Sequence, residues 1–379
     1  MKKNHTQKHT RRTGSMSLLA LASLTAFSGT ASAQVGQPPF GVTLNGMLDL
    51  GARYTRNSVG SMKSLSSGNT ATSVLVIKGT EDMGEGLKAS FWLESSILAD
   101  TGGAGSLTLT PTNQFFDRRS TVSLAGNFGE VRAGRDWNPV FLGYVYSDPF
   151  FTVGVASSAN FLNASVNTVF SRAFGSAANP TTISRVNNAI EYFTPPTLGG
   201  FYSHLMVGAS ENANANGGFR YTGGRVGYRA GKLDISASSS ATRIAAQDAE
   251  LKQAGIAGHY SLDAVRLSAF FTQTTFLSSK QNHWLIGAII PAGQGSIKVS
   301  YNKLDQRGTN AAGLSIGAND AQQYGLGYEY NLSKRSALYV NAAHLSNKGQ
   351  AKFVIPGGRP GIAGGSGSTG YELGMRHAF

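Results

Sequence analysis

The sequence contains no cysteine, so a disulfide framework, thiolate catalysis and any cysteine-ligated zinc or iron–sulfur site are excluded. No apolar run after Gln34 approaches the roughly 20 residues that a membrane-spanning helix needs. Glycine, by contrast, is abundant: 48 of the 379 residues are glycine, which is nearly double the roughly 7% of average usage. With 41% apolar residues, the chain is neither a disordered tail nor a hydrophobic helix bundle.

Residues 1–33 have the three zones of a secretory signal peptide. Residues 1–12 carry five basic side chains and no acidic one, residues 16–27 (MSLLALASLTAF) are apolar but too short to span a bilayer, and residues 31–33 (ASA) form a small-residue cleavage site. We therefore expect residues 1–33 to be removed on export and residues 34–379 to form the mature domain. Their removal lowers the formal net charge from +13 to +8, and a charge of this size in an exported protein gives no argument for nucleic-acid binding. A membrane anchor is the alternative interpretation.

Beyond Gln34, apolar and polar residues alternate with a period of two, which is typical of strands with two different faces. Leu233, Ile235 and Ala237, for example, alternate with charged and hydroxyl residues. We count about sixteen such segments along the chain. A soluble β-sandwich gives the same alternation, so this pattern alone leaves the environment of the strands open.

The connectors between these segments are short on one side and mostly long on the other, where three further links, around residues 211–217, 245–250 and 277–280, are short. The long ones are rich in Gly, Ser, Asn and Thr and cover residues 55–71, 98–114, 137–182, 306–320 and 347–369. An outer-membrane barrel has tight periplasmic turns and longer external loops, so this asymmetry favours a barrel. The sequence has no fixed-period repeat of the kind that a propeller or a solenoid would show.

The end of the chain has the pattern of a further strand. Tyr371, Leu373, Met375 and Phe379 fall on one face, with Glu372 and Arg376 on the other. A last strand of this kind would close a barrel beside the first one and leave no free edge in lipid. The predicted fold class is therefore all-β, a transmembrane antiparallel β-barrel.

Five stretches of the chain carry a resemblance to a known family through their order and spacing. They are residues 40–52 (FGVTLNGMLDLGA), 77–94 (IKGTEDMGEGLKASFWLE), 118–137 (RRSTVSLAGNFGEVRAGRDW), 185–195 (RVNNAIEYFTP) and 375–379 (MRHAF). Together they resemble the sixteen-stranded, trimeric general porins of Gram-negative outer membranes, in particular the beta-proteobacterial branch.

This resemblance implies a fold, a location and a function. The fold would have about 16 strands, with the long third loop, residues 137–182, folded into the pore. The protein would be a homotrimer in contact with outer-membrane lipid and lipopolysaccharide, inserted by the barrel-assembly machinery through the C-terminal Phe379. It would need no cofactor and would act as a passive, water-filled channel for small hydrophilic solutes and ions.

The resemblance also implies where the pore narrows. In this family an acid on the third loop faces a row of arginines on the wall, and Asp148, Arg118 and Arg185 match these positions. Opposed charges across a narrow aqueous gap create a transverse field that biases ion passage. Each residue also has a plainer interpretation. Arg118 could pair with a neighbouring carboxylate (Asp117 or Glu130), Arg185 could pair with Glu191, and Asp148, which precedes a proline, could simply start a turn.

One departure from the family pattern leaves the ion preference open. Val74 stands where relatives carry a third arginine, whereas the charge of +8 favours anions. Further lumen-lining residues are expected at Lys78, Lys88, Glu94 and Lys298, and the first two would partly compensate for the missing arginine.

Two other kinds of function were weighed against a general diffusion channel. An enzyme is disfavoured because the chain has no HExxH motif, and its GxSxG match at residues 313–317 (GLSIG) falls within the long connector expected over residues 306–320. No metal site is indicated. The alternative is a substrate-specific outer-membrane channel with a saturable solute site, which block of the conductance by one class of solute would reveal. Receptor use of the external loops, by phage or host molecules, would be an added role.

Overall fold

The computed structural model describes residues 40–104, 114–163, 165–175, 181–209 and 219–379. All of them belong to the second of two units into which the chain divides, residues 36–379. The expected signal peptide and its cleavage site lie outside the described residues, so their removal stays a prediction.

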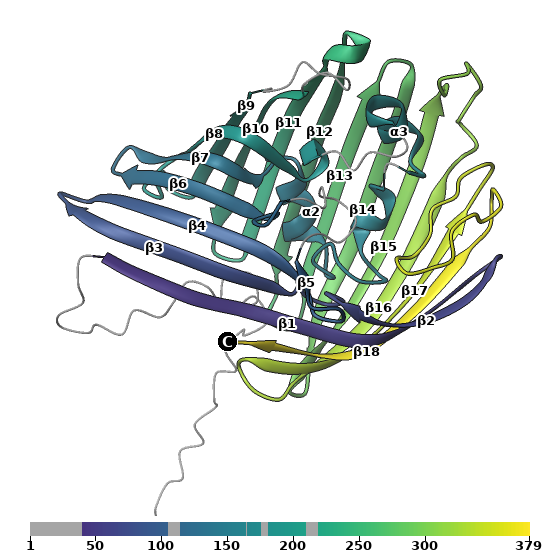
Figure 1. Cartoon of the computed structure of the whole chain (residues 1–379), viewed down its shortest axis with the longest axis horizontal. Coiled ribbons are helices and arrows are strands. Elements are labelled where there is room, and N and C mark those ends of the chain that lie inside the picture. The colour runs from purple at the N-terminus through teal and green to yellow at the C-terminus, as the bar shows by residue number, and fades with distance from the viewer. Residues whose placement is uncertain (1–39, 105–113, 164, 176–180, 210–218) are drawn as a thin grey trace, which may run out of the picture. The chain divides into compact units, whose positions relative to one another are not determined.

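The described strands form one closed antiparallel barrel (Figure 1). Its ring has sixteen strands, as predicted, and two short strands, β2 and β5, are additional to the ring. The ring runs through β1 (Phe40–Asn57), β3 (Val74–Gly84), β4 (Leu87–Leu98), β6 (Arg119–Gly126), β7 (Gly129–Trp137), β8 (Arg185–Phe193), β9 (Phe201–Gly208), β10 (Phe219–Ala230), β11 (Leu233–Ile244), β12 (Ala249–Ser261), β13 (Arg266–Phe276), β14 (Ser279–Ala292), β15 (Gly295–Gly308), β16 (Ala321–Asn331), β17 (Ser336–Asn347) and β18 (Ser368–Ala378).

The barrel closes where the first strand pairs with the last. β1 and β18 are antiparallel neighbours, with Tyr54 opposite Tyr371. The backbone of Phe379 exchanges two hydrogen bonds with Gly46, at 3.0 and 3.1 Å. Gly46 is required here, because a Cβ at this position would lie 2.5 Å from both the Phe379 ring and a neighbouring carbonyl oxygen. The predicted closing role of the chain end is confirmed.

The segment after β1 differs from the prediction. A long connector was expected over residues 55–71, but a two-residue turn at residues 58–59 leads into β2 (Gly60–Ser67), which pairs with the second half of β1. Serine-rich β2 has the composition of a loop, and pairing with β1 overrides that local tendency. Residues 68–73 then turn into the lumen, where the Asp49 carboxylate accepts hydrogen bonds from the backbone N–H groups of Thr70 (2.7 Å) and Ala71 (2.8 Å). β5 (Gly103–Ala104) is a short addition paired with the end of β4.

The longest connector, residues 138–184 and here called L3, carries most of the helical structure. It contains α2 (Phe141–Ser147), η1 (Ser158–Phe161), α3 (Thr168–Phe174) and η2 (Thr181–Ile183), and a further short turn, η3 (Ala245–Gln247), joins β11 to β12. The Asn167 side chain starts α3 by accepting hydrogen bonds from two backbone N–H groups of its first turn. α2 and α3 lie against the inner surface of β12–β14 (Figure 1), so the predicted inward folding of the third loop is confirmed. Within the described part of the chain, no helix is both long and apolar enough to cross a membrane.

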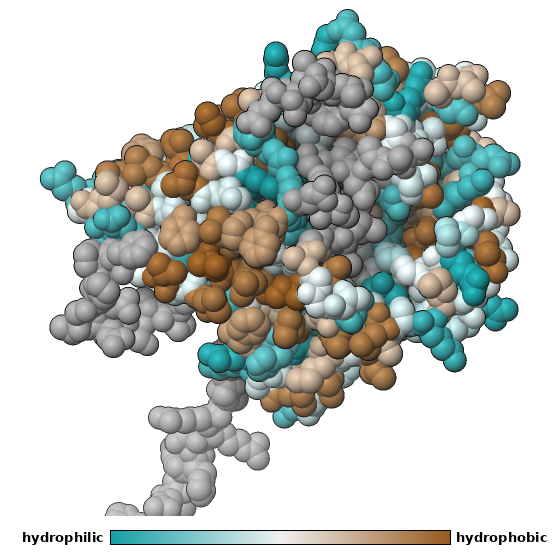
Figure 2. All heavy atoms as spheres, viewed as in Figure 1, coloured by the Kyte–Doolittle hydropathy of each residue, from teal (hydrophilic) through white to brown (hydrophobic). Residues whose placement is uncertain are grey.

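The two faces of the strands differ in polarity, as their alternation predicts. Polar side chains point inward and are buried under L3, among them His283, Asn302 and Gln323. Apolar side chains cover the outer surface, and Figure 2 shows such residues gathered over the first strands of the wall. A continuous exposed apolar surface on this scale marks contact with lipid or protein rather than water. Its members include Val42, Leu44, Val226, Ile235, Ile256, Leu267, Ile286, Leu326 and Leu373.

Candidate functional site

A cavity in the lumen, here called the passage, is lined by three parts of the chain. The charged residues that the barrel wall contributes are Arg53, Asp117, Arg118 and Arg185. L3 contributes residues 152–163 in part, and the connector between β17 and β18, residues 348–367 and here called L8, contributes residues 354–357 in part. The wall lining thus carries three arginines and one aspartate, whereas the L3 and L8 residues that line the passage are uncharged.

Arg118 and Arg185, both predicted from the sequence, meet at Trp137, the last residue of β7. The Cζ atom of Arg185 lies 3.5 Å from the centroid of the Trp137 ring, and that of Arg118 lies 5.5 Å from it. Aromatic faces attract guanidinium groups, so the indole holds both side chains at the passage. Trp137 was read from the sequence only as the start of the third loop, and the sequence gives no signal for this contact.

The two arginines differ in how they are neutralised. Arg118 forms an ion pair with Glu94, rather than with the Asp117 or Glu130 weighed from the sequence. Arg185 is 3% exposed, and its Nε and Nη2 atoms have no hydrogen-bond partner among the described residues. Its anticipated partner Glu191 contacts His204 instead. A buried guanidinium without an acceptor is costly, and an anion in the passage would satisfy it.

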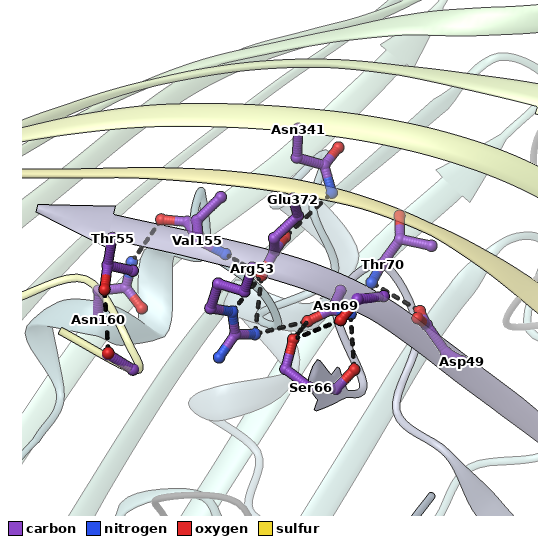
Figure 3. Close-up of polar contacts among 12 residues, drawn as sticks. Asp49, Arg53, Thr55, Ser66, Asn69, Thr70, Val155, Asn160, Asn341 and Glu372 are labelled. Atoms are coloured by element: carbon purple, nitrogen blue, oxygen red, sulfur yellow. Dashed lines mark hydrogen bonds and ion pairs between the residues drawn. The ribbon is translucent and has the colours of Figure 1, made fainter. Parts of the chain in front are cut away.

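Arg53 is a third arginine of this wall, and the sequence analysis missed it. Its Nε donates to Oε1 of Glu372 (2.8 Å) and its Nη2 donates to Oδ1 of Asn69 (2.6 Å), as Figure 3 shows. The same Glu372 oxygen accepts a hydrogen bond from the backbone N–H of Val155 in L3 (3.1 Å). Strand parity, which points Asp49 and Arg53 to one face, was the available signal.

Asp148 is placed inside L3 and is not among the residues that line the passage. It is buried, and its carboxylate accepts hydrogen bonds from the backbone N–H groups of Phe150 (2.8 Å), Thr152 (3.2 Å) and Ser158 (2.8 Å). Burial raises the pKa of the Asp148 carboxyl, and these hydrogen bonds oppose that rise. The geometry gives Asp148 the role of shaping the turn that carries the L3 side of the passage.

Replacing Asp148 by asparagine is expected to loosen this turn. An amide has only one acceptor oxygen, so at least one buried N–H group loses its partner, at a cost of about 1–3 kcal/mol. Limited proteolysis of the folded barrel should show faster cleavage between residues 148 and 158. Asp100→Asn, in an exposed turn, is the matched control. Equal cleavage rates in the two variants would contradict the role of Asp148.

The other predicted lumenal residues lie apart from the passage, with one exception. Glu94 reaches it through its ion pair with Arg118. Lys78 lies beside the Trp92 ring, with its Nζ 5.0 Å from the centroid, and Lys88 is exposed at the short-turn end of β4. Lys298 is buried, and its Nζ lies 3.0 Å from a carboxylate oxygen of Glu329. The three lysines are not among the residues that line the passage.

L8 was expected as an external loop, but part of it folds inward. Phe353 and Ile355 are fully buried, and they share one apolar cluster with Phe150, Val155 and Phe161 of L3. Burying two side chains of this size contributes several kcal/mol in total, at about 1.5–3 kcal/mol each. L8 thus fixes L3 from the external side while it lines the passage.

Comparisons with known proteins agree with this architecture. The family of Gram-negative porins matches residues 20–350 of the chain. The outer membrane porin protein 32 of Delftia acidovorans is 36% identical over 382 aligned residues, which cover 96% of this chain and 99% of that protein. The chain belongs to the Gram-negative porin family. This confirms the resemblance noted in the sequence, and members of the family are channels.

Further relatives of this porin support the same assignment. The solved structure of an anion-selective porin from Comamonas acidovorans has a TM-score of 0.75 at 34% identity, covering 90% of this porin and 100% of that chain. The major outer membrane protein P.IB of Neisseria lactamica is 26% identical and covers 89% of this porin and 94% of its own length. The porin is a passive diffusion channel in the outer membrane of a Gram-negative bacterium.

Proposed function

We propose that the passage between the arginine wall, L3 and L8 is the selective constriction of this porin, and that it prefers small hydrophilic anions. The observation that carries the proposal is the unpartnered, buried guanidinium of Arg185 beside Arg118 and Trp137. Low-dielectric walls focus the field of these charges on the water between them.

Arg53 supports the same preference for anions, because it supplies a third arginine where Val74 replaces the one that relatives carry. Val74 cannot supply a charge, whereas Arg53 lines the passage from the neighbouring strand β1. The four arginines at or near the passage, Arg53, Arg118, Arg135 and Arg185, outnumber the nearby carboxylates of Glu94, Asp117 and Glu372. Of the residues proposed from the sequence, Arg118 and Arg185 act at the constriction, while Asp148 acts by fixing the shape of L3.

A homotrimer in outer-membrane lipid and lipopolysaccharide is part of this proposal. In the described residues, β2 pairs with β1 alone, so its other edge is open. Val59 and Leu65 near this edge are 48% and 54% exposed. An open strand edge in a membrane needs a partner for its backbone groups, and a second copy of the chain would provide one. The ring of Phe379, packed over Gly46 and 44% exposed, is accessible for recognition by the barrel-assembly machinery.

The test is single-channel recording of the refolded porin in a planar bilayer under a potassium chloride gradient. We expect conductance steps in groups of three, a linear current–voltage relation, and a reversal potential on the anion side. A reversal potential on the cation side would overturn the anion preference. Block of the chloride current by one class of solute at the constriction would instead favour the substrate-specific channel.

A further inference from the structure

A second group of basic side chains lies on the inner wall at the other side of α2, toward the short-turn end of the barrel. Short turns mark the periplasmic end of outer-membrane barrels. The group is built on β10 and β13, with Arg225 and Arg266, and none of its members lines the constriction. Both guanidinium groups meet Tyr146, near the end of α2.

Arg225 is a buried cation that forms no direct ion pair with any carboxylate in the described part of the chain. It is 6% exposed, and its Cζ lies 5.0 Å from the ring centroid of Tyr146 and 5.1 Å from that of Tyr202 on β9. Its Nε is buried and has no acceptor, and the guanidinium makes no hydrogen bond or ion pair to any residue in the described part of the chain. The two rings hold the charge in place but leave its N–H groups unused.

The one nearby carboxylate is already committed. Asp234 accepts hydrogen bonds from the Tyr202 hydroxyl (2.7 Å) and from Nε of Arg229 (2.7 Å), and it forms an ion pair with Nη2 of Arg229 (2.6 Å). Arg266 donates from Nη2 to the backbone oxygen of Tyr146 (2.7 Å), and its Nε is also buried without an acceptor. Two guanidinium groups therefore lie beside Tyr146, and the carboxylate nearest to them, Asp234, is already bonded to Arg229 and Tyr202.

We propose that Arg225 and Arg266 form a second anion site, on the periplasmic side of L3, which binds a small doubly charged oxyanion such as hydrogen phosphate. Guanidinium groups recognise oxyanions through paired N–H···O hydrogen bonds, and such bonds are stronger where the surroundings exclude water. The inference rests on the proposed function in that the site would receive the anions that the constriction passes, whereas anions from the periplasmic side reach it directly. An anion leaving Arg118 and Arg185 would meet this site next, so the two sites act in series.

The experiment measures block of the chloride current by inorganic phosphate added on the short-turn side of the reconstituted porin, at a pH where the dianion predominates. Wild-type porin should show saturable block. In Arg225→Gln and Arg266→Gln, the phosphate concentration for half block should rise roughly tenfold or more, because each variant removes a charged donor. Arg220→Gln, an exposed arginine on the same strand β10, is the control and should behave as wild type.

Further variants distinguish anion binding at Arg225 and Arg266 from a purely structural role of these residues. They also distinguish it from anion binding at the constriction. Arg225→Lys keeps the charge against both rings but loses the paired donors, so block should weaken while the heat stability of the barrel is unchanged. In Arg118→Gln/Arg185→Gln, the chloride preference should fall but phosphate block should persist. If phosphate block is equal in wild type and Arg225→Gln, or disappears only in the constriction variant, the second site does not exist. If wild-type porin shows no anion preference yet Arg225→Gln loses the block, the proposed function fails and the second site stands.

Discussion

A porin carrying Arg118→Gln and Arg185→Gln together is expected to lose its anion preference, and its reversal potential under a salt gradient should move toward the cation side. The two guanidinium groups lie at one face of a narrow passage, held by the Trp137 ring. A unit charge about 4 Å from a passing ion contributes roughly 1 kcal/mol in bulk water and roughly 4 kcal/mol near a protein surface. Since about 1.4 kcal/mol is a factor of ten, the anion-to-cation permeability ratio should fall on the order of tenfold or more.

The single variants divide this effect between the two residues. Arg118→Gln also frees the Glu94 carboxylate from its ion pair, so it should favour cations more than Arg185→Gln does. Arg335→Gln, in an exposed turn away from the passage, is the control. An unchanged reversal potential in the double variant would remove both residues from the constriction. Loss of the heat-stable barrel on gels would mean instead that the arginines brace the wall.

Replacing Gly154 by alanine is expected to give the open channel several conductance levels in place of one. Gly154 has a φ of +74°, and a Cβ there would lie 2.0 Å from the backbone oxygen of Asn69 and 2.8 Å from the Glu372 carboxylate. The tip of L3 therefore cannot keep its place against residues 68–73. With its anchor at Glu372 disturbed, the tip should occupy several positions, each with its own conductance, which single-channel recording resolves.

Gly175→Ala is the matched control for this change. Gly175 also lies in L3, with a φ of +81°, but a Cβ there would meet no atom within 4 Å. Both variants place an L-residue at a positive φ, a strain of roughly 1–3 kcal/mol, and only Gly154→Ala adds the collision. Multiple conductance levels in both variants would show that backbone strain, not the contact with Asn69, controls the loop.

The barrel could be predicted from the sequence because strand parity and connector lengths are local properties. The resemblance to the porin family, rather than alternation, singled out Arg118 and Arg185, and the length of L3 together with that resemblance indicated the loop that folds into the barrel. Residues 60–67 were missed as strand, since a serine-rich segment has little intrinsic strand preference and pairs only because β1 extends beside it. Arg53 was missed because its significance depends on Glu372, more than 300 residues later in the chain.

The interior of the loops could not be predicted, because its contacts join segments remote in sequence. Nothing in the pattern of L8 showed that Phe353 and Ile355 pack on L3 rather than face solvent. Asp148 matched a constriction position, yet its carboxylate turns to three backbone N–H groups within ten residues. An aspartate can bond to backbone N–H groups close to it in sequence instead of facing a distant site. The sequence alone does not show which of these two a given aspartate does.

The bond between the Val155 N–H group and the Glu372 carboxylate spans 217 positions, and its acceptor stands on the last strand. L8, which packs on L3, is also the segment immediately before that strand. The narrow part of the pore is therefore completed only when β18 joins β1 at the end of assembly. A chain in which β1 and β18 are still apart lacks both a closed wall and the Glu372 anchor that holds L3 in place.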